Sequence, residues 1–290
     1  MPYKEADLPC IDIREESLLE LSPEVLAVLL RDHTTGRNIF WATHDYEPLG
    51  GGYDYHSEIL PELITGEKGM VIRPRVFKSK ENQTDRSKDM AEVFTPSWIC
   101  NAQNNLVDDA LPNDMTWQDY VRQTCLEITC GEAPYLVSRY DAATGESIPL
   151  EKRIGLLDRK LRMVNDKTET KEEWLEWAQI AYKNTYGYEW QGDNLLLARE
   201  ALLYTFIDYY KARFNENPKE ADILEIAKII SWNLWQMDGL KYGIPGQEPT
   251  EQLEGSFMDM FYPPAPEERY CRIFDWEKHE EVIYAKLIKQ

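Results

Sequence analysis

The sequence predicts an α/β protein with a parallel sheet covered by helices on both faces, preceded by a mixed α/β region. From Thr95 onward, segments with helical spacing of apolar residues alternate with short apolar segments typical of buried strands. Hydrophobic residues make up 43% of the 290 positions and aromatic residues 12%, which suffices for a sizeable core. The change of pattern divides the chain into an N-terminal lead-in, residues 1–92, and a second unit, residues 93–290.

The lead-in carries one helical pattern and two candidate strands. Apolar residues at helical spacing predict a helix from Glu15 to Arg31. Strands are expected at Asn38–Thr43 and near Met70–Phe77, on either side of a glycine-rich turn at Gly50–Gly52.

The second unit is expected to open with a helix that Thr95 caps, with Pro96 in its first position, and that runs to about Leu111. The elements expected after it are a strand at Leu126–Thr129, a helix at Lys171–Thr185, a strand at Tyr186–Trp190, a long helix capped by Asp193, a helix at Glu220–Ile229 and a strand at Ser231–Gln236. A loop at Gly243–Pro266, a strand at Arg269–Asp275 and a helix at Lys278–Leu287 complete the prediction.

Composition excludes several classes of protein. Five cysteines without a CxxC pair, and four scattered histidines, indicate reduced thiols and no metal site. No apolar stretch has the length of a membrane span, and the N-terminus has no signal-peptide pattern. The expected location is therefore the cytoplasm, without membrane or metal.

The formal charge of −20 opposes binding to nucleic acid, which depends on lysine and arginine at the phosphates. One local basic strip lies between residues 73 and 88, and a local strip suffices for DNA binding. Its candidate DNA-binding residues are Arg73, Arg75, Lys78, Lys80, Arg86 and Lys88. The alternative interpretation is an ordinary solvated loop.

Four short motifs follow one another in the second unit. They are Glu92–Pro96, Glu127–Leu136, Tyr186–Trp190 with the helix start Leu195–Ala201, and Asn233–Leu240. A Thr-Pro turn that opens a helix, followed by strands ending in small or acidic residues, is typical of sites that cradle nucleotide-like cofactors. Each motif alone is commonly a plain turn, a surface glutamate or a core tryptophan. Four such motifs in this order are hard to produce by chance.

These motifs resemble those of the N6-adenine DNA methyltransferases, the modification subunits of restriction–modification systems. In that family the motif matching Glu127–Leu136 reads acidic, Pro, small, Cys or Ala, Gly, polar, Gly, any residue, aromatic, Leu. Here Ile128 replaces the proline and Ala133 replaces the second glycine. The resemblance implies a Rossmann-like sheet that binds S-adenosylmethionine (SAM).

The resemblance also implies a role for each motif. Thr95 and Pro96 would close over the methionine part of SAM. The turn along the cofactor would be formed by Glu127, Cys130, Gly131 and Ala133. Glu189 would accept hydrogen bonds from the ribose hydroxyls, Trp190 would lie against the adenine, and Asp238 would accept a hydrogen bond from the adenine amino group. Gly131 would let the backbone pass close to the ligand, Ala133 would fit with a negative φ, and Pro134 would begin a helix.

The family binds the target base through Asn/Asp-Pro-Pro-Tyr/Phe, and that motif is missing. The single Pro-Pro, within Tyr262–Ala265, lacks both the polar acceptor and the aromatic ring. The candidate catalytic residues are instead Asp275 and Trp276, which follow the last expected strand without prolines. The chain after Asp238 is also shorter than a complete methyltransferase sheet requires.

We therefore expect a SAM-binding, methyltransferase-like protein of the restriction–modification type. It would act on adenine N6 in DNA, either with a partner specificity or restriction subunit or through the degenerate Asp275–Trp276 motif. The alternative is a catalytically inactive acidic protein that binds a basic partner or imitates DNA. A methyltransferase for small molecules or proteins is disfavoured, because the Thr-Pro motif is chiefly a feature of the DNA enzymes.

Overall fold

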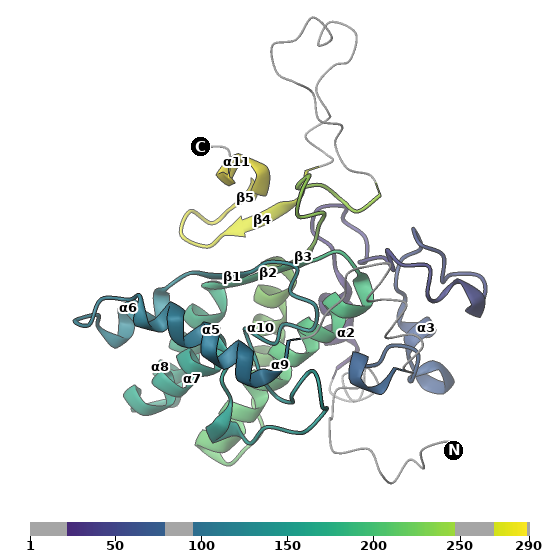
Figure 1. The fold of residues 1–290 in the computed structure, drawn as a ribbon. Helices are drawn as coiled ribbons and strands as arrows, with labels where there is room; N and C mark the ends of the chain where they lie inside the picture. Colours follow the sequence, from purple (N-terminus) through teal and green to yellow (C-terminus); the bar gives the residue numbers. More distant parts are fainter. Residues whose placement is uncertain (1–21, 79–94, 247–269, 289–290) are drawn as a thin grey trace, which may run out of the picture.

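The computed structural model describes residues 22–78, 95–246 and 270–288. They form a mixed α/β fold around a three-stranded parallel sheet in the order β1-β2-β3 (Figure 1). The strands are β1 (Cys125–Glu127), β2 (Thr185–Glu189) and β3 (Leu234–Gln236). Glu127 pairs with Gly187, and Glu189 pairs with Gln236. The carboxyl ends of all three strands therefore lie at one edge of the sheet.

Helices surround this sheet. The α-helices are α2 (Pro23–Leu30), α3 (Pro61–Ile64), α5 (Ser97–Asp109), α6 (Trp117–Arg122), α7 (Leu156–Lys167), α8 (Lys171–Lys183), α9 (Gly192–Phe214), α10 (Glu220–Asn233) and α11 (Tyr284–Ile288). Short 3-10 helices are η2 (Glu47–Leu49), η3 (Gly66–Lys68), η4 (Arg75–Phe77) and η5 (Leu150–Lys152). No helix in the described ranges combines the length and the apolar character that a membrane crossing needs.

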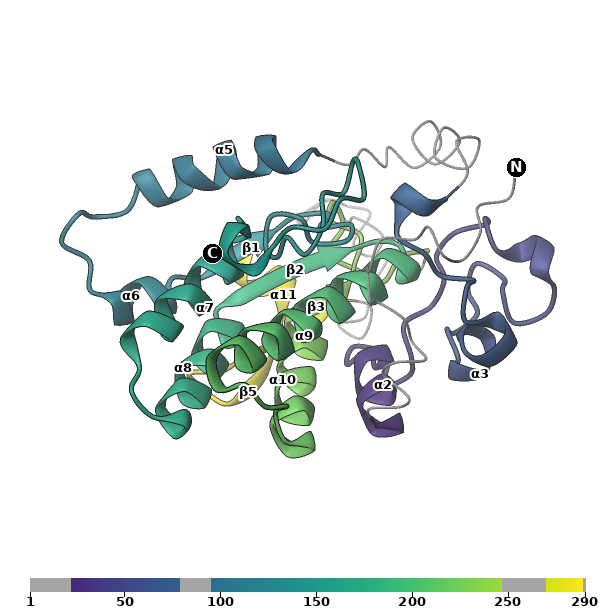
Figure 2. The same ribbon diagram turned by 90° about the horizontal axis from the view of Figure 1, so that it is seen from below.

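The two faces of the sheet are covered differently. Helices α7 to α10 lie on one side of the sheet, and α5 lies on the side of β1 (Figures 1 and 2). The other side carries an antiparallel hairpin of β4 (Arg272–Asp275) and β5 (Glu280–Ile283), followed by α11. A second core cluster forms there, where Trp235 of β3 packs with Ile273 and Tyr284. The expected helix layer on both faces is therefore not seen among the described residues.

Helix α9 is the centre of the larger core. Most of its residues are buried, including Arg199, whose guanidinium has no exposure. Arg199 donates to the carbonyls of Leu29, Arg31, Ser231 and Leu234. Because a buried cation is costly unless it is hydrogen-bonded, this set of acceptors holds α2 and the start of β3 against α9.

The lead-in shares this core. Leu26 and Leu29 of α2 belong to the same buried cluster as Leu195 and Ile226. Phe40 donates its amide to Oε1 of Gln236 (3.0 Å), and Nε2 of Gln236 donates to the Phe40 carbonyl (2.8 Å). The described part of the lead-in therefore packs directly on the carboxyl end of β3.

The prediction of two strands in the lead-in is wrong. Residues 38–43 make only isolated bridges, such as Arg31 with Asn38 and Phe40 with Glu58. The backbone groups of this segment hydrogen-bond to the Gln236 side chain and to single loop carbonyls, so no strand ladder forms. Residues 70–77 contain η4 instead of a strand.

Helix boundaries also differ from the expectation. Pro96, not Thr95, is the N-cap of α5, and Gln191, not Asp193, is the N-cap of α9. Residues 231–233 form the last turn of α10, because its helical hydrogen bonds continue to Asn233. No helix follows Pro134, where the chain makes turns, and α7 was not expected at all.

The expected helix at 278–287 is confirmed only from Tyr284 onward, as α11, because a turn and β5 occupy residues 278–283. Oδ1 of Asp275 accepts the amides of Glu277 and Lys278, and His279 adopts a positive φ of 56°. This tight turn reverses the chain and pairs Ile273 with Val282. Residues 15–21 of the first expected helix, and residues 247–266 of the expected loop, lie outside the described residues.

Candidate cofactor site

The carboxyl edge of the sheet brings Gly131 and Glu189 into direct contact. The Gly131 amide donates to Oε2 of Glu189 (2.8 Å), and the Gln191 amide donates to Oε1 (3.2 Å). Met237, which precedes Asp238, donates its amide to the Glu189 carbonyl (2.9 Å). The three segments that the motifs single out therefore meet at one place.

The turn after β1 is built from left-handed residues. Thr129, Gly131 and Ala133 have φ of 46°, 54° and 59°, so the expected negative φ at Ala133 is wrong. The turn folds back over β2, since the Cys130 amide donates to the Tyr188 carbonyl (2.8 Å). An alanine is forced into this conformation because its amide donates to the Cys130 carbonyl (2.7 Å) and its side chain is fully buried.

The left-handed Ala133 leads to a stability prediction. Replacing it with glycine should relieve a strain of about 1–2 kcal/mol, which offsets the lost methyl burial and the added chain entropy. We expect Ala133→Gly to change the unfolding free energy by less than about 0.5 kcal/mol. The control Ala178→Gly, inside α8 and also buried, should lose about 1–2 kcal/mol in the same urea titrations. Equal losses in both variants would contradict the strain.

Glu127 closes this turn on itself. Its carboxylate accepts the amides of Tyr135 (3.4 Å) and Leu136 (3.2 Å). Burial raises the pKa of Glu127 well above its usual value, and the two amides lower it only in part. Glu127 therefore shapes the loop of residues 128–136 rather than facing an open space.

The start of α5 lies beside this loop. Thr95 hydrogen-bonds to Tyr135, an interaction that lowers the Tyr135 pKa against the stronger effect of burial. Asn104 of α5 donates to the carbonyl of Tyr135 (3.0 Å), and the Ser97 amide donates to Asp141 (2.8 Å). Thr95 and Pro96 are thus held next to the loop that contains Gly131.

Glu189 has unusual electrostatics for a carboxyl group. Its pKa is raised to about 7, chiefly by burial and to a smaller extent by nearby Asp193, although hydrogen bonds from the amides of Gly131, Gln191 and Trp190 lower it. A carboxylate offers about four lone-pair directions, and these three amides use most of them. A ribose hydroxyl would therefore share this largely buried carboxylate with the amides.

Trp190 and Asp238 are less clearly directed at a ligand. The indole Nε1 of Trp190 donates to the hydroxyl of Tyr55 (3.0 Å). Oδ1 of Asp238 accepts the amides of Leu240 (2.7 Å) and Lys241 (3.3 Å), which closes its own turn. Within the described ranges, Oδ2 of Asp238 accepts no hydrogen bond and could accept one from a ligand.

The candidate catalytic residues lie at the other edge of the sheet. Trp276 donates to Oδ1 of Asn233 (2.8 Å), and Asn233 immediately precedes β3. Cys271 contacts the Gln236 carbonyl at the end of β3, so β4 runs from the carboxyl edge to the amino edge. Asp275 caps its own turn and pairs with Lys278. The structure therefore does not bring Asp275 and Trp276 together with Gly131 and Glu189.

The basic strip is not one cationic surface. Nζ of Lys78 pairs with Oδ2 of Asp193 (3.0 Å), and the two side chains are 8% and 0% exposed. Arg75 donates its amide to Glu132 (2.7 Å), and Arg73 is exposed with its Nε on the Met70 carbonyl. Lys80, Arg86 and Lys88 lie outside the described residues. The structure places Lys78 in a buried ion pair, so its charge is not displayed on the surface where the DNA-binding role was expected.

Lys78 should instead matter for stability. Removing one partner of a buried ion pair leaves the other charge desolvated, so we expect Lys78→Met to cost about 2–3 kcal/mol. Arg73→Met, at an exposed position, should change the unfolding free energy by less than about 0.5 kcal/mol. Urea denaturation of both variants checks this difference. A stable Lys78→Met protein that loses DNA retention would favour the DNA-binding interpretation.

Two polar groups near the site were not anticipated. Tyr46 donates its hydroxyl to Oδ2 of Asp193 (2.7 Å) at the first turn of α9. Tyr140 donates to Glu132, whose other oxygen accepts the Arg75 amide. Tyr46 and Asp193 are 147 positions apart, and Arg75 and Glu132 are 57 positions apart, so these contacts leave no local signal in the sequence. In the described part of the chain, no group of His, Cys, Asp and Glu is arranged to hold a metal ion.

Comparison with protein-family profiles, with curated proteins and with solved structures found no match.

Proposed function

We propose that the chain binds SAM at the carboxyl edge of β1, β2 and β3, as a methyltransferase-like protein of the restriction–modification type. The contact between the Gly131 amide and the Glu189 carboxylate carries this proposal. This contact places a turn whose backbone could approach a ligand closely beside a carboxylate that could accept a ribose diol. An adenosyl cofactor needs both features. SAM would supply an electrophilic methyl group there.

Three further observations support the proposal. The strands follow the motif order and are parallel neighbours. Ala133 keeps a positive φ at the position where the family pattern has glycine. Thr95 lies beside Tyr135 of the same loop. These three observations agree with the arrangement that the proposed cofactor would require.

Action on adenine N6 in DNA would require a partner subunit. Asp275 and Trp276 lie at the opposite sheet edge, so they would not reach a base placed beside the cofactor. A specificity or restriction subunit would have to contribute the groups that hold the flipped adenine. This chain would supply the cofactor half.

Isothermal titration calorimetry with SAM and S-adenosylhomocysteine tests the proposal. We expect one site per chain and saturation by both ligands, whereas adenosine alone should bind more weakly because it lacks the methionine part. Absence of heat with either ligand, together with an unchanged melting temperature, would rule out the cofactor site.

A second candidate, a non-catalytic protein that binds a basic partner or imitates DNA, is favoured by an exposed edge. Ile128 and Leu126, in and just after the edge strand β1, are 63% and 40% exposed, and Trp98 on α5 is 71% exposed. Exposed edge strands with apolar side chains are templates for pairing with another chain. A gel-shift assay at low salt separates the two: retention of DNA favours the methyltransferase, and failure together with capture of a basic nuclease subunit favours the interaction protein.

A further inference from the structure

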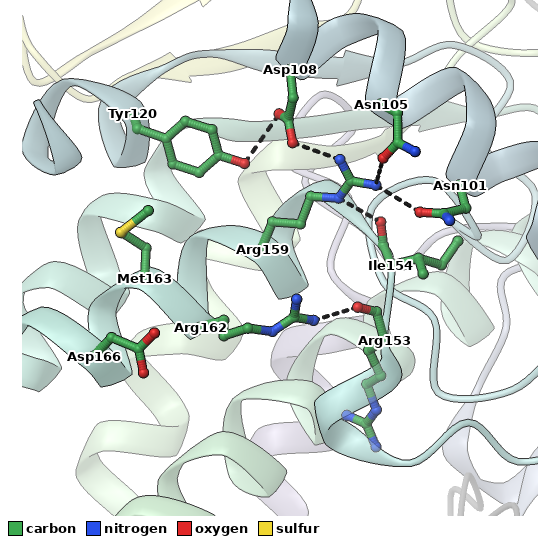
Figure 3. Close-up of a pocket in the computed structure, with 10 residues that line it drawn as sticks. All are labelled: Asn101, Asn105, Asp108, Tyr120, Arg153, Ile154, Arg159, Arg162, Met163 and Asp166. Carbon is green, nitrogen blue, oxygen red and sulfur yellow. Dashed lines mark hydrogen bonds and ion pairs between the residues drawn. The ribbon is translucent and has the colours of Figure 1, made fainter. Parts of the chain in front are cut away.

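A cavity of about 430 Å³ lies between α5, α6 and α7, on the helical side of the protein (Figure 3). Asn101, Asn105 and Asp108 of α5 form one wall, and Arg159 and Arg162 of α7 form the facing wall. None of these residues belongs to the proposed cofactor site. The volume falls in the range of small-molecule sites, which is about 300–1,000 Å³.

Arg159 is a fixed, neutralised part of the wall. Its Nη1 pairs with Oδ2 of Asp108 (2.5 Å), and its Nε donates to the Ile154 carbonyl (3.1 Å). Its Nη2 donates to the side-chain oxygens of Asn101 and Asn105, both at 2.8 Å. The charges of Arg159 and Asp108 cancel, so neither one attracts or repels a ligand strongly.

Arg162 is in a different position. Its Nη2 donates to the Arg153 carbonyl, its side chain also hydrogen-bonds to Tyr209, and its buried Nε has no hydrogen-bond partner. In the ranges that the structure describes, no carboxylate lies within ion-pair distance of Arg162, whereas Arg153 beside it pairs with Asp208 (2.7 Å). Figure 3 shows the remaining nitrogen of Arg162 directed toward the Arg159 side chain. An unneutralised guanidinium in a cavity is unexpected in a chain with a net charge of −20.

The rest of the lining mixes charged and apolar side chains: Arg153 and Asp166 are charged, and Tyr120, Ile154 and Met163 are the less polar members. Met163 and the ring of Tyr120 lie on the same side of the cavity as Arg162, and the Tyr120 hydroxyl is occupied by Asp108 (3.1 Å). Burial and the Asp108 charge raise the Tyr120 pKa, so the phenol stays neutral. Asp166, an exposed residue of the lining, is the carboxylate without an ion pair among these residues. Beside these charged and amide side chains, Tyr120 and Met163 supply apolar contacts.

We propose that this cavity binds a small organic anion, whose carboxylate or phosphate group pairs with Arg162 and whose apolar body packs on Tyr120 and Met163. A guanidinium binds either group through paired N–H donors, and such charge-assisted bonds are the strong ones. The aromatic ring and the thioether would provide van der Waals contact for the body of the ligand. This site does not depend on the proposed SAM site.

Benzoate, phenyl phosphate and neutral benzamide are suitable probes, because they share a ring and differ in the charged group. In calorimetric titrations of the full chain we expect at least one anion to bind about tenfold more tightly than benzamide. Preference for benzoate identifies a carboxylate ligand, and preference for phenyl phosphate identifies a phosphate ester. Equal binding of all three compounds overturns the proposal. Absence of binding at ligand concentrations up to about 10 mM, where weak fragments still bind, overturns it as well.

Variants locate the site. Arg162→Gln should weaken the preferred anion roughly tenfold, whereas Arg73→Gln, an exposed arginine outside the cavity, should leave its affinity unchanged. Should Arg162→Gln not fold, Asp166→Asn at the rim provides a second readout, with anion affinity expected to increase. Unchanged affinity in Arg162→Gln or in Asp166→Asn counts against the site. Glu189→Gln should leave anion binding intact, so failure here is distinct from failure of the SAM proposal.

Discussion

Glu189→Ala is expected to weaken SAM binding at least about 100-fold, because each hydrogen bond to a charged group contributes about 1.5–3 kcal/mol. The variant loses the acceptor for the ribose hydroxyls. It also releases the Gly131 amide, which the carboxylate holds at 2.8 Å, so the turn along the cofactor is no longer fixed. Isothermal titration calorimetry with SAM measures the change directly.

The matched control is Glu176→Ala, an exposed glutamate of α8 remote from the carboxyl edge. It should bind SAM with wild-type affinity. A thermal melt of both variants separates loss of binding from loss of fold. Wild-type affinity in Glu189→Ala, with the fold intact, would refute the assignment of Glu189.

The raised pKa of Glu189, about 7, makes SAM binding depend on pH. The ionised carboxylate is the better acceptor, so affinity should rise between pH 6 and pH 8. Glu189→Gln, which cannot ionise, should show a flat profile over the same range. A wild-type profile as flat as that of Glu189→Gln would argue against a ribose contact at this carboxylate.

The same shift affects stability with the opposite sign. The folded protein holds the Glu189 proton more tightly than the unfolded chain, whose pKa is near 4.5. Between these two values the folded state binds more protons, so the contribution of Glu189 to the unfolding free energy falls as the pH rises. Relative to Glu189→Gln, the wild type should therefore lose stability between about pH 4.5 and pH 7.

Gly192→Ala is expected to cost about 4 kcal/mol of unfolding free energy, among the largest effects of a single substitution. A Cβ at Gly192 would lie 2.1 Å from the Phe40 carbonyl oxygen and 2.9 Å from its carbon. That carbonyl cannot move freely, because it accepts Nε2 of Gln236 at 2.8 Å. The clash would separate the lead-in from the start of α9.

Gly51→Ala is the control for Gly192→Ala. A Cβ at Gly51 meets nothing within 4 Å, and its φ is not in the left-handed region. We expect its unfolding free energy to stay within about 0.5 kcal/mol of wild type. Chemical denaturation of the two variants measures the difference, and comparable stabilities would disprove the close packing of Phe40 on α9.

Local periodicity predicted much of the second unit. The apolar spacing in α8, α9 and α10 and the short apolar segments of β1 and β2 were placed within a few residues, since burial of one face leaves a regular pattern. The C-terminal hairpin was predicted in part: β4 matches the expected strand and α11 matches the end of the expected helix, whereas β5 was mistaken for the start of that helix. Its turn depends on Asp275 accepting two amides and on a left-handed His279, which no periodicity reports.

The candidate site required the tertiary structure. The sequence by itself determined which segments end in small or acidic residues, and in which order they follow, because turn chemistry is local. It did not determine that Gly131 and Glu189, 58 positions apart, share a hydrogen bond. Nor did it determine that Lys78 is buried against Asp193, or that Trp276 reaches Asn233 at the far edge. Those contacts depend on strand direction and on the packing of distant elements, which a local pattern of residues does not encode.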